Sequence, residues 1–214
     1  MPFDSRSVAA AQRHLRQSDP TMRRLIELVG PFTLKAKRDR FGMLVASIIS
    51  QQISGKAARS IRRRLVELIA PERIAPHTLA RRSIAELRSV GISPQKAGYL
   101  HDLAAKVDLG DVRLSRTGRM SDDEAIAELI QVKGIGVWTA QMFLIFSLGR
   151  LDIFPHEDLG IRSALKNLYG LRELPDKDTS HEIARPWRPY ATIASWYCWR
   201  SHEVRELLRP GSAR

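Results

Sequence analysis

Two glycines flank a single apolar residue in the segment Gly134-Ile135-Gly136, and helical patterns lie on both sides of it. Glycine tolerates a positive φ and lets another backbone approach closely, so this segment can form a tight turn, with Ile135 packed between the two helices. The second helix would begin with backbone N–H groups that have no helical partner, at Val137, Trp138 and Thr139. Such groups and the helix dipole together form a site for an anion such as phosphate. The alternative is a plain corner between two helices.

A second segment with chemical potential is the loop from Asp152 to Asp158, which holds three carboxylates. Asp158 directly precedes a helical pattern, and aspartate is a favoured helix N-cap. From composition alone, a cap is the simpler interpretation. The two roles are compatible, because a cap holds the carboxylate rigidly, and a fixed negative charge can stabilise positive charge on a bound molecule. Asp152 and Glu157 are interpreted as ordinary loop carboxylates.

The charge balance of the chain favours a polyanionic partner. Lys and Arg number 35 against 23 Asp and Glu, and the formal net charge is +12. A domain this basic usually binds nucleic acid. A soluble protein that is merely basic is the alternative at this point.

Composition also excludes several classes of protein. Cys198 is the single cysteine, which rules out a disulfide framework and an iron–sulfur cluster held by four thiolates. The six histidines show no metal-binding spacing. No apolar run approaches the roughly 20 residues that span a bilayer, and the N-terminus lacks the apolar core of a signal peptide. We therefore expect a cytoplasmic protein that does not contact membranes.

The elements that position these residues are predicted to be helical almost throughout. Asp19 and Pro20 have the character of an N-cap and a first helical residue, and Gly30 ends that helix. Ser121 with Glu124 forms a capping box. The other expected helices begin at Ser83, Ser93, Val137, Asp158 and Pro189, and the one over 137–148 is apolar nearly all round and should be buried. The sequence predicts an all-α protein of roughly ten helices.

The pattern VKGIGVWTA at residues 132–140 resembles the hairpin of the helix-hairpin-helix DNA glycosylases. The downstream Asp158-Leu-Gly resembles the loop of the AlkA type, the 3-methyladenine glycosylases of bacteria and yeast. The similarity runs from about His14 to Arg200 and is most specific at 129–165 and 186–199. It implies two helical lobes with an active-site cleft between them. Residues 39–152 would form the inner lobe, with the helix-hairpin-helix at about 122–148, and residues 1–38 plus 153–214 the second lobe.

The resemblance also implies an activity. The chain would flip alkylated purines out of DNA and hydrolyse their N-glycosidic bond, leaving an abasic site. Asp158 falls on the catalytic aspartate, whose charge would stabilise the oxocarbenium-like sugar or align water. The bases 3-methyladenine and 7-methylguanine are already cationic and leave readily. The sequence leaves open whether hypoxanthine, ethenoadenine or 1-methyladenine is also accepted.

The same resemblance implies an aromatic pocket for the flipped base, made by Trp138, Met142, Trp196 and Tyr197. A cationic base stacks well on electron-rich rings. Trp187, Tyr190 and Trp199 are interpreted as core or lobe contacts. Glycosylases that also cleave the strand use a lysine where this chain has Trp138, so no lyase activity is expected.

DNA contacts are implied at three places. The backbone carbonyls of Ile130, Val132 and Gly134 would hold a monovalent cation, Na⁺ or K⁺, that bridges to a phosphate. Gln52, where the AlkA type can carry leucine, would be the wedge that fills the gap left by the flipped base. Ser93, Lys96 and the helix start at Pro94 would form a second phosphate anchor. The full set of expected DNA-binding residues is Gln52, Ile53, Ser54, Ser93, Lys96, Lys133, Gly134, Ile135, Gly136 and Thr139.

Two alternatives remain. One is a different glycosylase of the superfamily, of the endonuclease III or adenine-mismatch type, which usually carries an iron–sulfur cluster. The other is a helix-hairpin-helix module that binds DNA without catalysis. The favoured interpretation is a monomeric, cytoplasmic, nucleoid-associated enzyme without a cofactor, acting on double-stranded DNA that contains alkylated bases.

Overall fold

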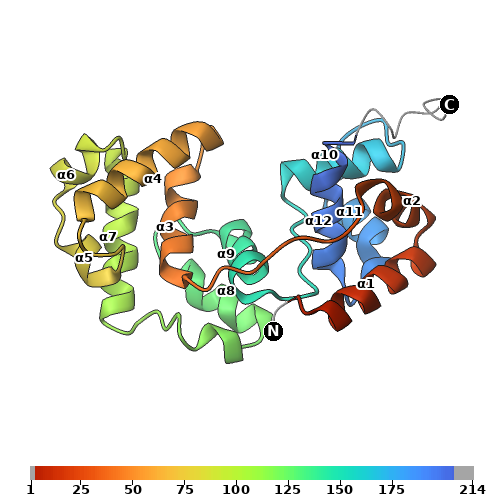
Figure 1. Ribbon diagram of the computed structural model, residues 1–214, viewed down its shortest axis with the longest axis horizontal. Helices are drawn as coiled ribbons and strands as arrows, with labels where there is room; N and C mark the ends of the chain where they lie inside the picture. The colour runs from red at the N-terminus through yellow and green to blue at the C-terminus, as the bar shows by residue number, and fades with distance from the viewer. Residues whose placement is uncertain (1–2, 205–214) are drawn as a thin grey trace. The chain divides into compact units, whose positions relative to one another are not determined.

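The computed structural model describes residues 3–204, and this part of the chain holds twelve α-helices and no β-strand (Figure 1). The expected all-α fold is confirmed. The chain forms two compact units: unit 1 comprises Met1–Ala36 and Gly149–Arg214, and unit 2 comprises Lys37–Leu148. The expected lobes have boundaries within a few residues of these, and their residues 1–2 and 205–214 lie outside the described residues.

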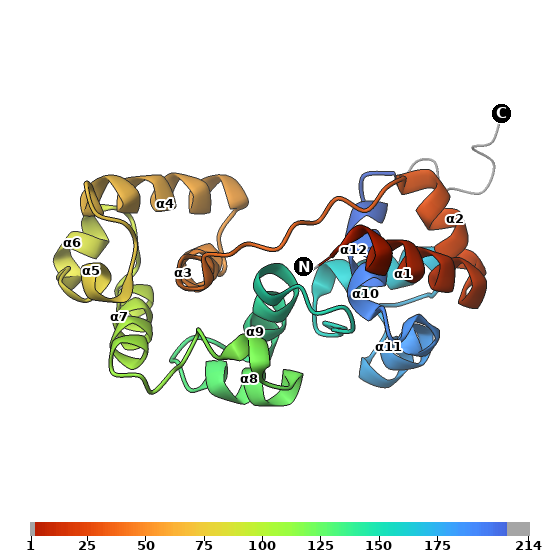
Figure 2. The same ribbon diagram turned by 60° about the horizontal axis from the view of Figure 1, so that its bottom comes forward.

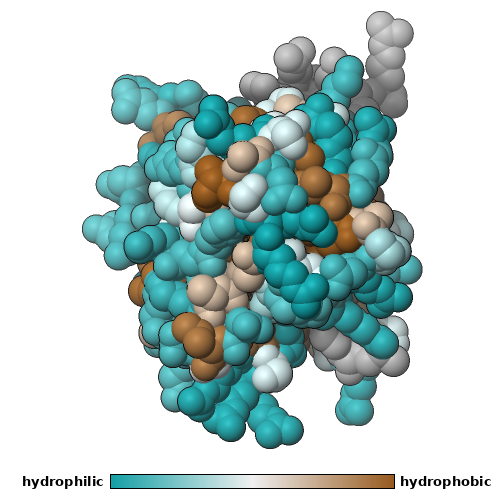
Figure 3. All heavy atoms as spheres, turned by 90° about the vertical axis from the view of Figure 1, so that its left-hand side faces the viewer, coloured by the Kyte–Doolittle hydropathy of each residue, from teal (hydrophilic) through white to brown (hydrophobic). Residues whose placement is uncertain are grey.

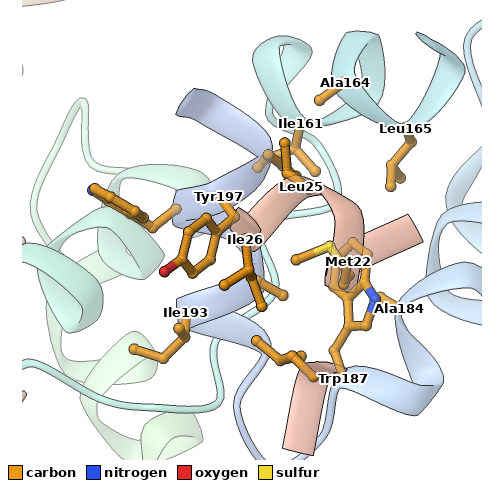
Figure 4. Close-up of a cluster of buried hydrophobic side chains, with 14 of the residues drawn as sticks. Met22, Leu25, Ile26, Ile161, Ala164, Leu165, Ala184, Trp187, Ile193 and Tyr197 are labelled. Atoms are coloured by element: carbon orange, nitrogen blue, oxygen red, sulfur yellow. The ribbon is translucent and has the colours of Figure 1, made fainter. Parts of the chain in front are cut away.

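The described part of unit 1 contains five α-helices. They are α1 (Ser5–Ser18), α2 (Pro20–Val29), α10 (Leu159–Leu168), α11 (Lys177–Ala184) and α12 (Ala191–Ser201). Figure 4 shows how α2, α10 and α12 direct Leu25, Ile161 and Tyr197 into one cluster of buried side chains. Trp187 and Met22 extend the same cluster. This core therefore fixes the start of α10, where Asp158 lies.

A buried carboxylate ties the core of unit 1 together. Asp19 is 6% exposed and caps α2 by accepting the backbone N–H of Thr21 and of Met22. Its Oδ2 also accepts the Tyr169 hydroxyl at 2.5 Å and the Trp187 indole N–H at 2.9 Å. Burial, together with the neighbouring Asp19 carboxylate, raises the pKa of Tyr169, so the phenol keeps its proton. Each of these buried polar groups is satisfied, as a stable core requires.

Unit 2 contains the remaining helices. They are α3 (Arg40–Ser50), α4 (Gly55–Ile69), α5 (Pro76–Ala80), α6 (Ile84–Ser89), α7 (Pro94–Asp108), α8 (Asp122–Ile130) and α9 (Val137–Phe143), with short turns η1 (Thr117–Arg119) and η2 (Leu144–Leu148). Helix α3 packs against α4, α7 and α9 (Figure 2). Leu44, Val45, Ile48 and Ile49 bury its apolar stripe. The face of the molecule seen in Figure 3 is mostly hydrophilic, with scattered apolar patches.

The helix starts follow the capping residues closely. Asp19, Ser83, Ser93, Ser121 and Asp158 each accept a backbone N–H in the first turn of the helix they precede. The capping box of Ser121 and Glu124 is present, and Gly30 ends α2 with a φ of 82°. These local signals are sufficient to place five of the helices.

Two expectations about helices need correction. The last helix begins at Ala191, not Pro189, because Tyr190 has a non-helical backbone and is the N-cap residue. The helix after the hairpin is not buried all round, because Val137 and Trp138 at its start are 45% and 39% exposed. Helix α9 then continues as one turn of π-helix, Leu144–Leu148. None of the described helices has the length and apolar character needed to cross a membrane.

Candidate active site and nucleic-acid interface

The hairpin of unit 2 joins α8 to α9 and depends on Gly134. This residue has a φ of 82°, a backbone conformation that other residues rarely adopt. A Cβ atom there would overlap the ring of Tyr99 on α7. Ile135 is 4% exposed and lies in the core, as expected for the residue between the glycines. Glycine at position 134 is therefore required both by backbone geometry and by the approach of α7.

Two residues of α7 hold the hairpin backbone in place. Asp102 accepts the backbone N–H of Lys133 at 2.8 Å and the Lys106 ammonium at 2.9 Å. Lys106 also donates to the carbonyl of Gln131 at 2.5 Å. The hairpin thus has a fixed shape, with the side chain of Lys133 on the surface. The side chain of Thr139 is buried, so its backbone N–H is the group left to meet a phosphate.

The carbonyl groups that the resemblance assigns to a cation belong to this hairpin. Val132 accepts the N–H of Ile135 at 3.0 Å, and Gly134 accepts the side-chain amide of Gln51 at 2.8 Å. A carbonyl oxygen has two lone pairs, so one hydrogen bond leaves each of them able to bind an ion. Neutral oxygen ligands suit a hard cation. The donor set fits a monovalent cation.

The turn between α3 and α4, residues 51–54, contains the expected wedge and is called the wedge loop below. At its tip Gln52 has a φ of 56°, a left-handed conformation that costs a side-chain-bearing residue about 1–2 kcal/mol. Gln52 is exposed, as are its neighbours Ile53 and Ser54. Ser54 caps α4 by accepting the N–H of Ala57 at 3.2 Å. A strained residue at an exposed tip is a common mark of function, so Gln52 remains the predicted wedge.

Lys96 has a different environment from the one expected. Its ammonium group points to the end of α3, where it donates to the carbonyl of Ile49 at 2.8 Å and of Gln51 at 2.6 Å. Burial lowers the pKa of this amine. Ser93 caps α7 by accepting the N–H of Lys96. Two of the three donors of the ammonium group are used inside unit 2, which favours a structural role for Lys96 over the expected phosphate contact.

A basic groove runs beside the wedge loop between α3 and α4. Its volume is about 830 Å³, and its walls include Ser50 and Gly55 on either side of the loop. Four exposed cations, Lys37, Arg38, Arg59 and Arg62, line it together with one exposed carboxylate, Asp39. The excess of positive charge beside the wedge loop favours a nucleic-acid backbone here.

Asp158 belongs to unit 1 and is the N-cap of α10. Its Oδ1 accepts the backbone N–H of Ile161 at 2.9 Å and the indole N–H of Trp199 at 2.9 Å. The side chain is half-buried. The carboxylate is therefore fixed by two donors, one from its own helix and one from α12. Asp152, by contrast, accepts the Arg188 guanidinium and the N–H of Ala191 and ties the loop to α12, as a structural carboxylate.

The four expected pocket residues have unequal access to a base. Trp138 is 39% exposed at the start of α9, and Met142 lies one turn later, 6% exposed. Trp196 packs edge-on against Phe32 and Tyr197, with the Arg200 guanidinium 5.7 Å from its ring centre. It retains only 7% exposure.

Tyr197 requires a correction. Its ring is fully buried in the core of unit 1, and its hydroxyl donates to the carbonyl of Gly30 at 2.9 Å while accepting the amide of Gln12 at 2.6 Å. Burial raises the pKa of this phenol. The structure therefore makes Tyr197 a core residue, because no face of the ring is open to a base.

Sequence reasoning misses three residues that support these groups. Gln51 and Tyr99 contact the hairpin from the wedge loop and from α7, and Trp199 binds Asp158. The sequence favours a packing role for Trp199. Its position three residues after Trp196 in an aromatic helix is the one signal that could have indicated a role near the site. Nothing in the sequence marks Gln51, since its partner is distant along the chain.

Comparison with known proteins decides the family. Residues 45–189 match the model of the HhH-GPD superfamily of base excision DNA repair proteins. The chain belongs to this superfamily. The match contains both the helix-hairpin-helix of unit 2 and the aspartate of unit 1, so the resemblance seen in the sequence is confirmed.

Individual members of the HhH-GPD superfamily align over almost the whole chain. The DNA-3-methyladenine glycosylase 1 of Schizosaccharomyces pombe is 31% identical over 209 residues, covering 95% of this chain and 92% of the relative. A solved structure of the Schizosaccharomyces pombe enzyme in complex with abasic DNA has a TM-score of 0.81, covering 91% of this chain and 97% of that one. A DNA-3-methyladenine glycosidase from Bacillus halodurans has a TM-score of 0.82 at 33% identity, covering 92% of this chain and 91% of that one.

Proposed function

We propose that this protein is a monofunctional DNA glycosylase of base excision repair that hydrolyses the N-glycosidic bond of alkylated purines, chiefly 3-methyladenine and 7-methylguanine. The observation that carries the proposal is the carboxylate of Asp158, fixed at the start of α10 by Ile161 and Trp199. A relative at 31% identity, covering 95% of this chain, carries the name DNA-3-methyladenine glycosylase 1. The product would be an abasic site in double-stranded DNA.

The chemistry follows from a single fixed anion. As the bond between the sugar and the base breaks, positive charge develops at C1′ of the sugar. A carboxylate that is already oriented needs no reorganisation to stabilise this charge. The alkylated purines carry a positive charge themselves, so they depart as neutral bases and need little acid assistance. The carboxylate of Asp158 would also orient the attacking water by accepting a hydrogen bond from it.

Trp138 supports the absence of strand cleavage. A lyase of this superfamily forms a Schiff base through a lysine amine, and an indole cannot act as that nucleophile. Its partly exposed ring offers a stacking face for a flipped, cationic base. We therefore assign to Trp138 the recognition of the base, together with Met142 one turn later on the same helix.

The hairpin and the wedge loop supply the contacts to DNA. The N–H groups at the start of α9 and the carbonyls of Ile130, Val132 and Gly134 would bind one phosphate, directly and through a monovalent cation. The cation would supply charge neutralisation at the phosphate. The wedge loop would hold the duplex open with Gln52. The enzyme would work as a monomer on the chromosomal DNA of the cell.

The proposal predicts release of 3-methyladenine and 7-methylguanine from methylated double-stranded DNA by the purified full-length chain. The released bases are measured by chromatography, and the same DNA is analysed on a denaturing gel with and without hot alkali. Strand breaks should appear only after alkali, because the enzyme leaves intact abasic sites. Binding without any base release would favour a non-enzymatic module, and breaks without alkali would favour a lyase.

A further inference from the structure

Helix α7 supports both DNA-facing loops of unit 2 from one side. Lys96 binds the carbonyls of Ile49 and Gln51 at the base of the wedge loop. Tyr99 lies against Gly134 of the hairpin, and Asp102 accepts the N–H of Lys133. These three side chains are spaced three residues apart, so they lie along one strip of the helix. The wedge loop and the hairpin therefore have a common support.

A direct bond also joins the two loops. The side-chain amide of Gln51 donates to the carbonyl of Gly134 at 2.8 Å. The backbone carbonyl of the same residue accepts the Lys96 ammonium at 2.6 Å. Gln51 is thus held at both ends, immediately before the strained Gln52. These bonds restrain the loop, whose strained tip would otherwise relax to other conformations.

We infer that Gln51 and Lys96 are positioning residues that hold the wedge loop in a fixed register with the hairpin. The inference rests on the proposed function. In the proposed function, the hairpin binds a phosphate of the damaged strand. The wedge residue must then enter the base stack at a fixed distance from that phosphate. A displacement of about 1 Å is enough to slow such a reaction strongly. The two residues act through Gln52 and the hairpin, without touching the base themselves.

This role differs from phosphate binding in a measurable way. Each lysine that neutralises a phosphate makes binding to duplex DNA more sensitive to salt, by about 0.9 in the slope of log Kd against log salt. The Lys96 ammonium is directed at two carbonyls of its own unit. Its removal should leave the salt slope unchanged. Lys133, whose side chain is on the surface of the hairpin, should contribute to that slope.

The test uses variants that keep side-chain bulk and remove the donor: Gln51→Met and Lys96→Met. Single-turnover release of 7-methylguanine is measured from two duplexes, one with the lesion paired with cytosine and one with it opposite an abasic site, where flipping is easy. We expect Gln51→Met to slow release from the paired duplex about fivefold to tenfold, as loss of one hydrogen bond implies. Lys96→Met should slow it at least about tenfold, because a charged donor is lost. Release opposite the abasic site should fall less than about twofold in both variants.

Two control variants distinguish a positioning role from phosphate binding and from a general loss of activity. Gln17→Met, at an exposed position of α1, should behave as the wild type, whereas Lys133→Met should lower the salt slope by about 0.9. Three outcomes would each overturn the inference. They are equal slowing of base release from both duplexes, a Gln51→Met rate equal to that of Gln17→Met, and a lower salt slope in Lys96→Met. If Lys96→Met does not fold, Gln51→Met decides alone. A wild-type chain that releases no base would instead refute the proposed function itself.

Discussion

Replacing Asp158 with asparagine should lower the rate of base release from methylated duplex DNA by about 10²–10³-fold, the usual effect of losing one preorganised charge at a transition state. The substitution removes the negative charge and keeps the size of the side chain. Asparagine caps helices as well as aspartate does, and its Oδ1 can still accept the N–H groups of Ile161 and Trp199. Single-turnover rates, measured with enzyme in excess over DNA, give the effect on the chemical step.

A second substitution controls for structure. Asp158→Ala removes the cap as well as the charge and should cost about 1 kcal/mol of folding free energy, whereas Asp158→Asn should melt at nearly the wild-type temperature. Both variants should bind DNA with a neutral abasic analogue about as tightly as the wild type. Wild-type release rates in the asparagine variant would remove Asp158 from the mechanism. If Asp158→Asn instead lost as much thermal stability as Asp158→Ala, the role of Asp158 would be reduced to capping the helix.

The other large effect is expected at Gly134. Gly134→Ala places a Cβ on a residue with a φ of 82° and against the ring of Tyr99. Strain of this kind costs about 1–3 kcal/mol, and the hairpin must distort to relieve it. Because the proposed phosphate site lies on the hairpin, we expect duplex binding to weaken roughly tenfold to a hundredfold. Fluorescence anisotropy with a labelled duplex measures this change.

Two further variants identify the source of that loss. Gly98→Ala changes a glycine of α7 whose added Cβ would meet no atom within 4 Å, so binding should be unaffected and the helix slightly more stable. The double variant Gly134→Ala with Tyr99→Ala relieves the overlap but keeps the strained φ. It should recover part of the binding. An unchanged Kd in Gly134→Ala would show that the hairpin does not hold the phosphate.

Local sequence signals determine much of the fold. Capping residues act within one turn of their own helix, so Asp19, Ser93 and Ser121 place helix starts correctly. Helix α11 is missed because its residues Lys177–Ala184 form a short polar helix without an apolar stripe, although Asp176 caps it. The exposure of Trp138 is also missed, because burial depends on which elements surround a helix, and hydrophobic pattern alone does not give that.

The candidate site is predicted unevenly for the same physical reason. The positive φ of Gly134 and the N-cap role of Asp158 follow from the sequence, because both are local features. The sequence does not show the carbonyl partners of Lys96, since its ammonium group binds carbonyls about 45 residues away along the chain. Tyr197 has the residue type of a pocket ring but is buried in the core of unit 1, where Gln12 and Gly30 bind its hydroxyl. Partners distant along the chain become visible only in the folded structure.

The central claim is that the carboxylate of Asp158 faces the positive charge of the sugar in the transition state. Two abasic analogues test it: a pyrrolidine, which is cationic where C1′ would be, and a neutral tetrahydrofuran, each in the same duplex. We predict that the wild type binds the cationic duplex at least about a hundredfold more tightly than the neutral one, as transition-state mimicry implies. Asp158→Asn should lose most of that preference and keep its affinity for tetrahydrofuran. An equal preference in the variant and the wild type would contradict the claim.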